Sequence, residues 1–89
     1  MKIDIEKVNA GFLKSKNIGN WPVWEKEISD FQWEYAETEE CYILEGEADI
    51  ITDVATITIS ANDFVTFHKG LTCRWVIRKP IRKHYNFIE

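Results

Sequence analysis

Apolar and polar residues alternate in short runs from Phe31 to the end of the chain, a pattern typical of β-strands with one buried face. The runs are rich in β-branched and aromatic residues, which favour pleated strands. They cover residues 31–35, 41–45, 48–52, 56–60, 64–67, 73–77 and 81–88. Short polar, Gly or Pro breaks separate them, at the spacing of a small barrel or sandwich. The pattern therefore predicts an all-β protein built as a small antiparallel β-barrel.

The N-terminal third of the chain is less regular. Residues 2–8 alternate in the manner of an edge strand with one buried side, with Ile3, Ile5 and Lys7 on one face. Residues 9–16 form the one segment that we expect to make a short helical turn. Residues 21–24 form an extended aromatic segment, because Pro22 disfavours helical backbone at the residue before it. We expect this segment to lie across the mouth or the wall of the barrel.

Size and composition narrow the class of protein. A chain of 89 residues, 45% hydrophobic and 29% charged, can bury a single core, so we expect one domain over residues 1–89. No run approaches the roughly 18–20 apolar residues of a membrane helix. Residues 1–6 alternate Ile with charged residues, unlike a secretory signal. The sequence therefore predicts a cytoplasmic protein with no membrane partner.

Charge and cysteine content argue against a nucleic-acid-binding protein and against a disulfide-bonded one. The formal net charge is −4, and nucleic-acid binding depends on clustered Lys and Arg, so we expect no nucleic-acid partner. The one basic cluster, residues 74–83, is typical of a solvated strand and turn. Cys41 and Cys73 fall in separate predicted strands, and two thiols in a cytosolic protein are more often free than bridged. We expect no disulfide.

Two segments carry the most specific motif. Residues 39–46 read Glu-Glu-Cys-Tyr-Ile-Leu-Glu-Gly, and residues 62–73 end in Lys-Gly-Leu-Thr-Cys. Together they resemble the two halves of the cupin signature, in which a His-x-His pair and a Glu on neighbouring strands meet a third His from a later hairpin. The resemblance implies a cupin jelly roll, or double-stranded β-helix, with Glu39 at the position of the cupin glutamate. It places Trp33 and Tyr35 where the His-x-His pair stands, and Cys73 where the last His stands.

The matched positions offer few metal ligands. Only Glu39 and Cys73 could ligate, whereas transition metals usually take three or four protein ligands. We therefore expect no tightly bound cofactor. The alternative is manganese or another divalent metal held by Glu39, Cys73 and a recruited neighbour. Cys73 has a second interpretation, as a small buried hydrophobic residue.

Strand alternation predicts which side chains share a cavity with Glu39. If Cys73 points inward, Trp75 does too, and on the last strand Lys83 and Tyr85 share a face. A lysine beside Glu39 in an aromatic cavity could bind a polar ligand or work with it as acid and base. Alternatively, Lys83 could extend outward past Tyr85. We name Glu39, Lys83 and Tyr85 as catalytic candidates, and Trp33, Tyr35, Cys73 and Trp75 as ligand-binding candidates.

A finer resemblance covers nearly the whole chain. The runs Tyr-Ile-Leu-Glu-Gly at residues 42–46 and Lys-Gly-Leu-Thr-Cys-Arg-Trp at residues 69–75 resemble small single-domain cupins grouped with the cupin domain of (S)-ureidoglycine aminohydrolase. That resemblance implies a manganese-dependent release of ammonia from a ureide. Of the metal ligands of that family, this chain keeps Glu39.

Three functional hypotheses follow. The first is an enzyme that acts on a small polar metabolite without tightly bound metal. The second is a module that binds or senses a small molecule without chemistry, and the third is a structural or interaction protein whose barrel is fully packed. The expected partner is a small-molecule ligand, and the expected assembly is a monomer or a homodimer.

Overall fold

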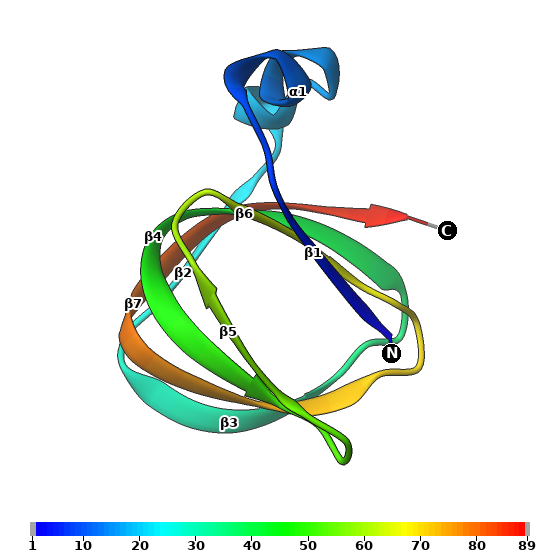
Figure 1. Ribbon diagram of the computed structural model, residues 1–89, viewed down its shortest axis with the longest axis vertical. Helices are drawn as coiled ribbons and strands as arrows, with labels where there is room; N and C mark the ends of the chain where they lie inside the picture. Colours follow the sequence, from blue (N-terminus) through cyan, green and yellow to red (C-terminus); the bar gives the residue numbers. More distant parts are fainter. Residues whose placement is uncertain (1, 89) are drawn as a thin grey trace.

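The computed structural model describes residues 2–88, in which seven strands form one antiparallel sheet that curls into a barrel (Figure 1). The elements are β1 (Ile3–Lys7), α1 (Ala10–Ser15), a 3-10 turn η1 (Ile18–Asn20), β2 (Val23–Lys26), β3 (Ser29–Glu34), β4 (Thr38–Ile51), β5 (Thr56–Ser60), β6 (Asp63–Phe67) and β7 (Thr72–Ile88). The sheet order is β1-β6-β4-β7-β2, and β3 also pairs with β7 and β5 with β4. The predicted all-β jelly roll with one short helix is confirmed. No helix in the described part of the chain is long and apolar enough to cross a membrane.

The two long strands correct one expectation. The predicted strands end at breaks around Gly46 and Pro80, but β4 and β7 run through both positions without interruption. The register between β4 and β7 shifts three times between Ile43 and Ala48, and Gly46 has a φ of +103°. An irregularity of this kind bends a strand sharply while its pairing continues on either side. The first part of β4 therefore pairs with β6, and the second part with β5.

The N-terminal segment packs against the outside of the barrel. Asn9 begins α1, its side chain accepting a hydrogen bond from the backbone N–H of Phe12 at 2.9 Å. The ring of Phe12 meets that of Phe64 edge to face, with centroids 5.0 Å apart. The predicted helical turn is confirmed, and in Figure 1 α1 stands outside the ring of strands. The buried face predicted for β1 holds only at Ile3, because Ile5 is exposed at the edge of the sheet.

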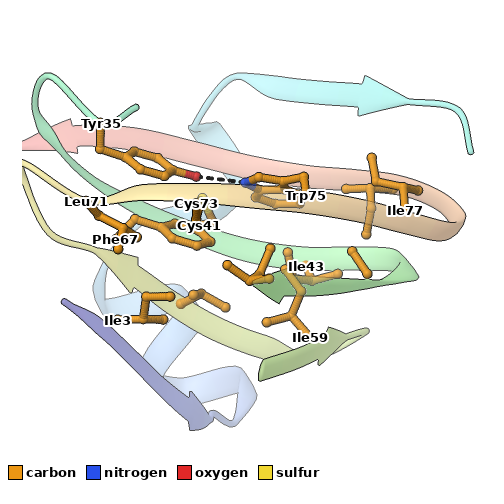
Figure 2. Packing of buried hydrophobic residues seen from close by; sticks show 14 residues of the cluster. Ile3, Tyr35, Cys41, Ile43, Ile59, Phe67, Leu71, Cys73, Trp75 and Ile77 are labelled. Carbon is orange, nitrogen blue, oxygen red and sulfur yellow. Dashed lines mark hydrogen bonds between the residues drawn. The ribbon is translucent and has the colours of Figure 1, made fainter. Parts of the chain in front are cut away.

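The core inside the barrel is aromatic at one end and aliphatic at the other. Tyr35 stacks on Phe67 with ring centroids 4.7 Å apart, and Trp75 lies 5.6 Å from Phe67. Figure 2 shows the Tyr35 hydroxyl directed at the indole nitrogen of Trp75, with isoleucines filling the far end of the barrel. Cys73 and Trp75 are both buried, as strand alternation predicted. The aromatic end is where the barrel keeps an open cavity.

Candidate active site

A buried ion pair lies at the base of the cavity. Glu39 on β4 and Lys83 on β7 are each 5% exposed, and Lys83 Nζ lies 2.7 Å from Glu39 Oε2. Lys83 is opposite Ile43 in the register, so its side chain reaches along the barrel interior to Glu39. The structure thus brings together the two residues that strand alternation placed on the inward faces. Lys83 does not extend outward past Tyr85.

Cys41 completes a three-residue cluster with this pair. Its thiol donates to Glu39 Oε2 at 2.6 Å, and Lys83 Nζ donates to Cys41 Sγ at 3.3 Å. Burial raises the pKa of the Cys41 thiol far above its usual value, so the side chain is neutral at ordinary pH. Cys41 was not among the site residues predicted from the sequence. Its spacing was a usable signal, because a residue two positions after Glu39 in a strand points to the same side.

Lys83 is protonated inside an aromatic cage. Its Nζ lies 4.9 Å from the ring centroid of Trp24 and 5.0 Å from that of Trp75. Burial alone would lower the pKa of Lys83, but its neighbours Cys41 and Glu39 outweigh this effect and the pKa is raised. Since Cys41 stays a neutral thiol, we assign the stabilising negative charge to the Glu39 carboxylate.

The cavity above this cluster has a volume of about 220 Å³. Aromatic walls surround the ion pair, and the lining residues are Trp24, Phe31, Trp33, Tyr35, Glu39, Trp75, Lys83, Tyr85 and Phe87. Trp33 and Phe87 are about half exposed, at 50% and 51%, and form the rim, whereas Tyr35 and Trp75 are buried at depth.

Six of the seven residues named from the sequence therefore line one cavity. Cys73 is the exception, because it lies in the hydrophobic core and not among the lining residues. Three lining residues, Trp24, Phe31 and Phe87, were missed. Trp24 and Phe31 lie on the short strands β2 and β3, whose pairing with β7 gave no local signal in the sequence. Phe87 lies two residues after Tyr85 on β7, so alternation was a usable signal for it.

Polar atoms remain available to a ligand in this cavity. Both contacts to the Glu39 carboxylate, from Lys83 and from Cys41, fall on Oε2. Glu39 Oε1 has no hydrogen-bond partner within residues 2–88. Every fully buried side-chain oxygen or nitrogen in these residues does have one, so Oε1 is not fully buried and keeps contact with the open space. The Tyr35 hydroxyl accepts from Trp75 Nε1 at 3.2 Å and retains its own proton. The cavity thus offers one anionic acceptor and at least one neutral donor.

The donor set does not fit the metal of the cupin signature. Trp33 and Tyr35 supply aromatic rings at two of the histidine positions, and the carboxylate of Glu39 is already paired with the ammonium of Lys83. In the part of the chain that the structure describes, no three His, Cys, Asp or Glu side chains are grouped to hold a metal. The two imidazoles have other contacts: His68 Nε2 lies 2.6 Å from Asp4, and His84 Nδ1 lies 2.9 Å from the Trp21 carbonyl oxygen.

The buried thiols predict a loss of stability at alkaline pH. Burial raises the pKa of Cys73 to about 11, with the charge of Lys83 opposing the shift. Between an unfolded value near 8.5 and this folded value, the native state holds a proton that the unfolded chain has released. The free energy of unfolding should therefore fall as pH rises from about 9 to 11. In urea denaturation across this range, Cys73→Ala should show a shallower decline than the parent protein, and an equal slope would contradict the assignment.

A curled antiparallel jelly roll with polar side chains from its long strands facing an internal cavity defines the class of protein as a cupin. Comparison with known families is more specific. The chain belongs to the EutQ-like cupin domain family, whose profile matches residues 13–85.

Solved structures agree with this assignment. The crystal structure of a DUF861 family protein from Thermotoga maritima is 46% identical, with a TM-score of 0.94, and the match covers 97% of this chain and 99% of that chain. The EutQ protein of Clostridium difficile is 18% identical with a TM-score of 0.68, over 96% of this chain and 66% of that one. A putative ethanolamine utilization protein Q from Salmonella typhimurium is 17% identical with a TM-score of 0.67, over 96% and 68%. At these identities the two EutQ structures show a shared fold. No curated protein matches the chain.

Proposed function

We propose that this cupin binds a small polar metabolite in its barrel cavity and transforms it without a tightly bound metal. The observation that carries the proposal is the Glu39–Lys83 ion pair at the base of an aromatic cavity, with Glu39 Oε1 free to contact a ligand. Buried, oppositely charged groups that face a cavity are typical of functional sites.

The roles follow from the contacts. Glu39 Oε1 can accept a proton or a hydrogen bond from the ligand, which makes Glu39 the general base. Lys83 keeps its positive charge beside Glu39 and stabilises negative charge that develops on the ligand, an effect that is stronger in a site shielded from water. Tyr85, in the cavity wall, is the proposed proton donor. Trp33, Tyr35 and Trp75 hold the ligand between aromatic faces.

The test is a thermal-shift screen of small polar metabolites against the parent protein, Glu39→Gln and Glu40→Gln, each with and without manganese. Glu40 is the matched control because it lies on the same strand and pairs with Lys16 away from the cavity. We expect ligands that raise the melting temperature of the parent and of Glu40→Gln without metal, and that lose this effect in Glu39→Gln. A ligand shift that appears only with manganese would contradict the metal-free site.

Two further measurements on the ligands found in the screen separate the alternatives. A module that binds without chemistry is favoured by the contacts that Lys83 Nζ already makes, two hydrogen bonds to Glu39 and Cys41 and close approaches to the rings of two tryptophans. It predicts that a bound ligand is recovered unaltered after long incubation, which mass spectrometry would detect. A manganese-dependent hydrolase of the ureidoglycine aminohydrolase type predicts ammonia release from a ureide only when manganese is present.

A further inference from the structure

The charge balance of the cavity restricts the charge of its ligand. Glu39 and Lys83 neutralise each other at 2.7 Å, and both are buried. A ligand with a net charge would add an uncompensated charge to this shielded site, which is unfavourable. An anion would also lie against the free Oε1 of Glu39, and a cation would meet the ammonium of Lys83. The aromatic faces of Trp24 and Trp75, which could otherwise attract a cation, already contact Lys83.

The free polar atoms restrict the hydrogen bonds that a ligand can make. Glu39 Oε1 requires a donor, and the Tyr35 hydroxyl can supply a proton to an acceptor. Lys83 uses one N–H for Glu39 and one for Cys41, and within residues 2–88 its third has no hydrogen-bond acceptor. A ligand that matches this arrangement presents an N–H donor beside a carbonyl acceptor.

The walls restrict shape and size. Aromatic rings make up most of the cavity lining, and its volume of about 220 Å³ holds roughly ten close-packed non-hydrogen atoms. Aromatic walls favour a planar ligand, which can stack on them over a large area. These limits describe a small, flat molecule.

We infer that the ligand of this cavity is an uncharged, planar amide, lactam or cyclic urea whose N–H donates to Glu39 and whose carbonyl accepts from Lys83 or Tyr35. This inference rests on the proposed function and names the chemical class of its ligand.

Four probes of similar size test each part of the inference. Benzamide is uncharged and has both N–H and carbonyl groups, benzoate is an anion, benzamidinium is a cation, and N,N-dimethylbenzamide lacks the N–H. Binding is followed by NMR titration of the indole N–H signals at pH 7. Trp24 and Trp75 report on the cavity, and Trp21, which packs in the outer cluster beneath α1, is the internal reference.

We expect benzamide to move the signals of Trp24 and Trp75 but not that of Trp21, with an affinity at least tenfold higher than that of the other three probes. Glu39→Gln should reduce the preference for benzamide over benzoate. Stronger binding of benzoate or benzamidinium would overturn the inferred class while leaving a ligand cavity in place. Equal binding of N,N-dimethylbenzamide would overturn the role of the N–H. If no probe moves Trp24 or Trp75 at millimolar concentration, both the class and the proposed ligand site are wrong.

Discussion

Replacement of Lys83 by methionine is expected to lower the free energy of unfolding by about 3–5 kcal/mol, because it leaves a buried carboxylate without its partner. Glu39 is 5% exposed, and its Oε2 would keep only the weak hydrogen bond from Cys41. Methionine has nearly the length of lysine, so packing against Trp24 and Trp75 is largely retained and the charge is the main difference. Urea denaturation followed by circular dichroism at pH 7 measures the change.

Two further variants show whether the unpaired charge is the cause. Lys16→Met removes the partner of Glu40 in a more exposed pair and should cost less than about 1 kcal/mol. The double variant Lys83→Met with Glu39→Gln removes both charges and should recover most of the lost stability, since apolar or neutral replacements of buried pairs are often tolerated. A loss in Lys83→Met no larger than that in Lys16→Met would show that Glu39 is not desolvated in solution.

The double variant also separates stability from function. If it is as stable as the parent protein but no longer binds the ligands that the parent binds, the ion pair is retained for its chemistry and not for folding. A buried salt bridge is in general weak evidence of a stabilising role. The free Oε1 of Glu39 gives a reason, independent of stability, for keeping a carboxylate at this depth.

Much of the fold could be predicted from alternation alone, because each strand has one face inside the barrel. The largest error falls at one corner, where β4 and β7 bend together. Gly46 and Pro80 are common signals of a turn, and the sequence was therefore divided at both places. In the structure the two residues lie against each other, so that β4 and β7 bend together without ending. Contact between segments 34 residues apart in the chain leaves no local trace in either one.

Strand alternation also predicted most of the residues of the site. Alternation indicates which side chains point into a barrel, and this was enough to bring Lys83 to Glu39. It does not indicate how deep a residue lies, so Cys73 was named both as a ligand-binding candidate and as a buried hydrophobic residue, and the structure places it in the core. Nor does it give the register of short strands. Trp24 is the cross-strand neighbour of Lys83, and this position makes it part of the cage.

Replacement of Gly46 by alanine is expected to lower the free energy of unfolding by at least about 3 kcal/mol, through backbone strain and overpacking together. The φ of Gly46 is +103°, a conformation that residues with a side chain rarely adopt. A Cβ added there would lie 2.2 Å from the carbonyl oxygen of Pro80 and 2.8 Å from that of Lys79. Both are backbone atoms of β7, so neither can rotate away as a side chain could.

The matched control is Gly19→Ala, since a Cβ at Gly19 has no atom within 4 Å and should change stability by less than about 1 kcal/mol. Urea denaturation of both variants gives the comparison, and a Gly46→Ala variant recovered only as unfolded protein agrees with the prediction. Equal stability of the two variants would show that the corner can relax.

The corner also sets the course of β7 between Pro80 and Lys83, so any Gly46→Ala protein that folds should bind ligand more weakly. Loss of binding without loss of stability would mean that β7 has shifted and carried Lys83 away from Glu39.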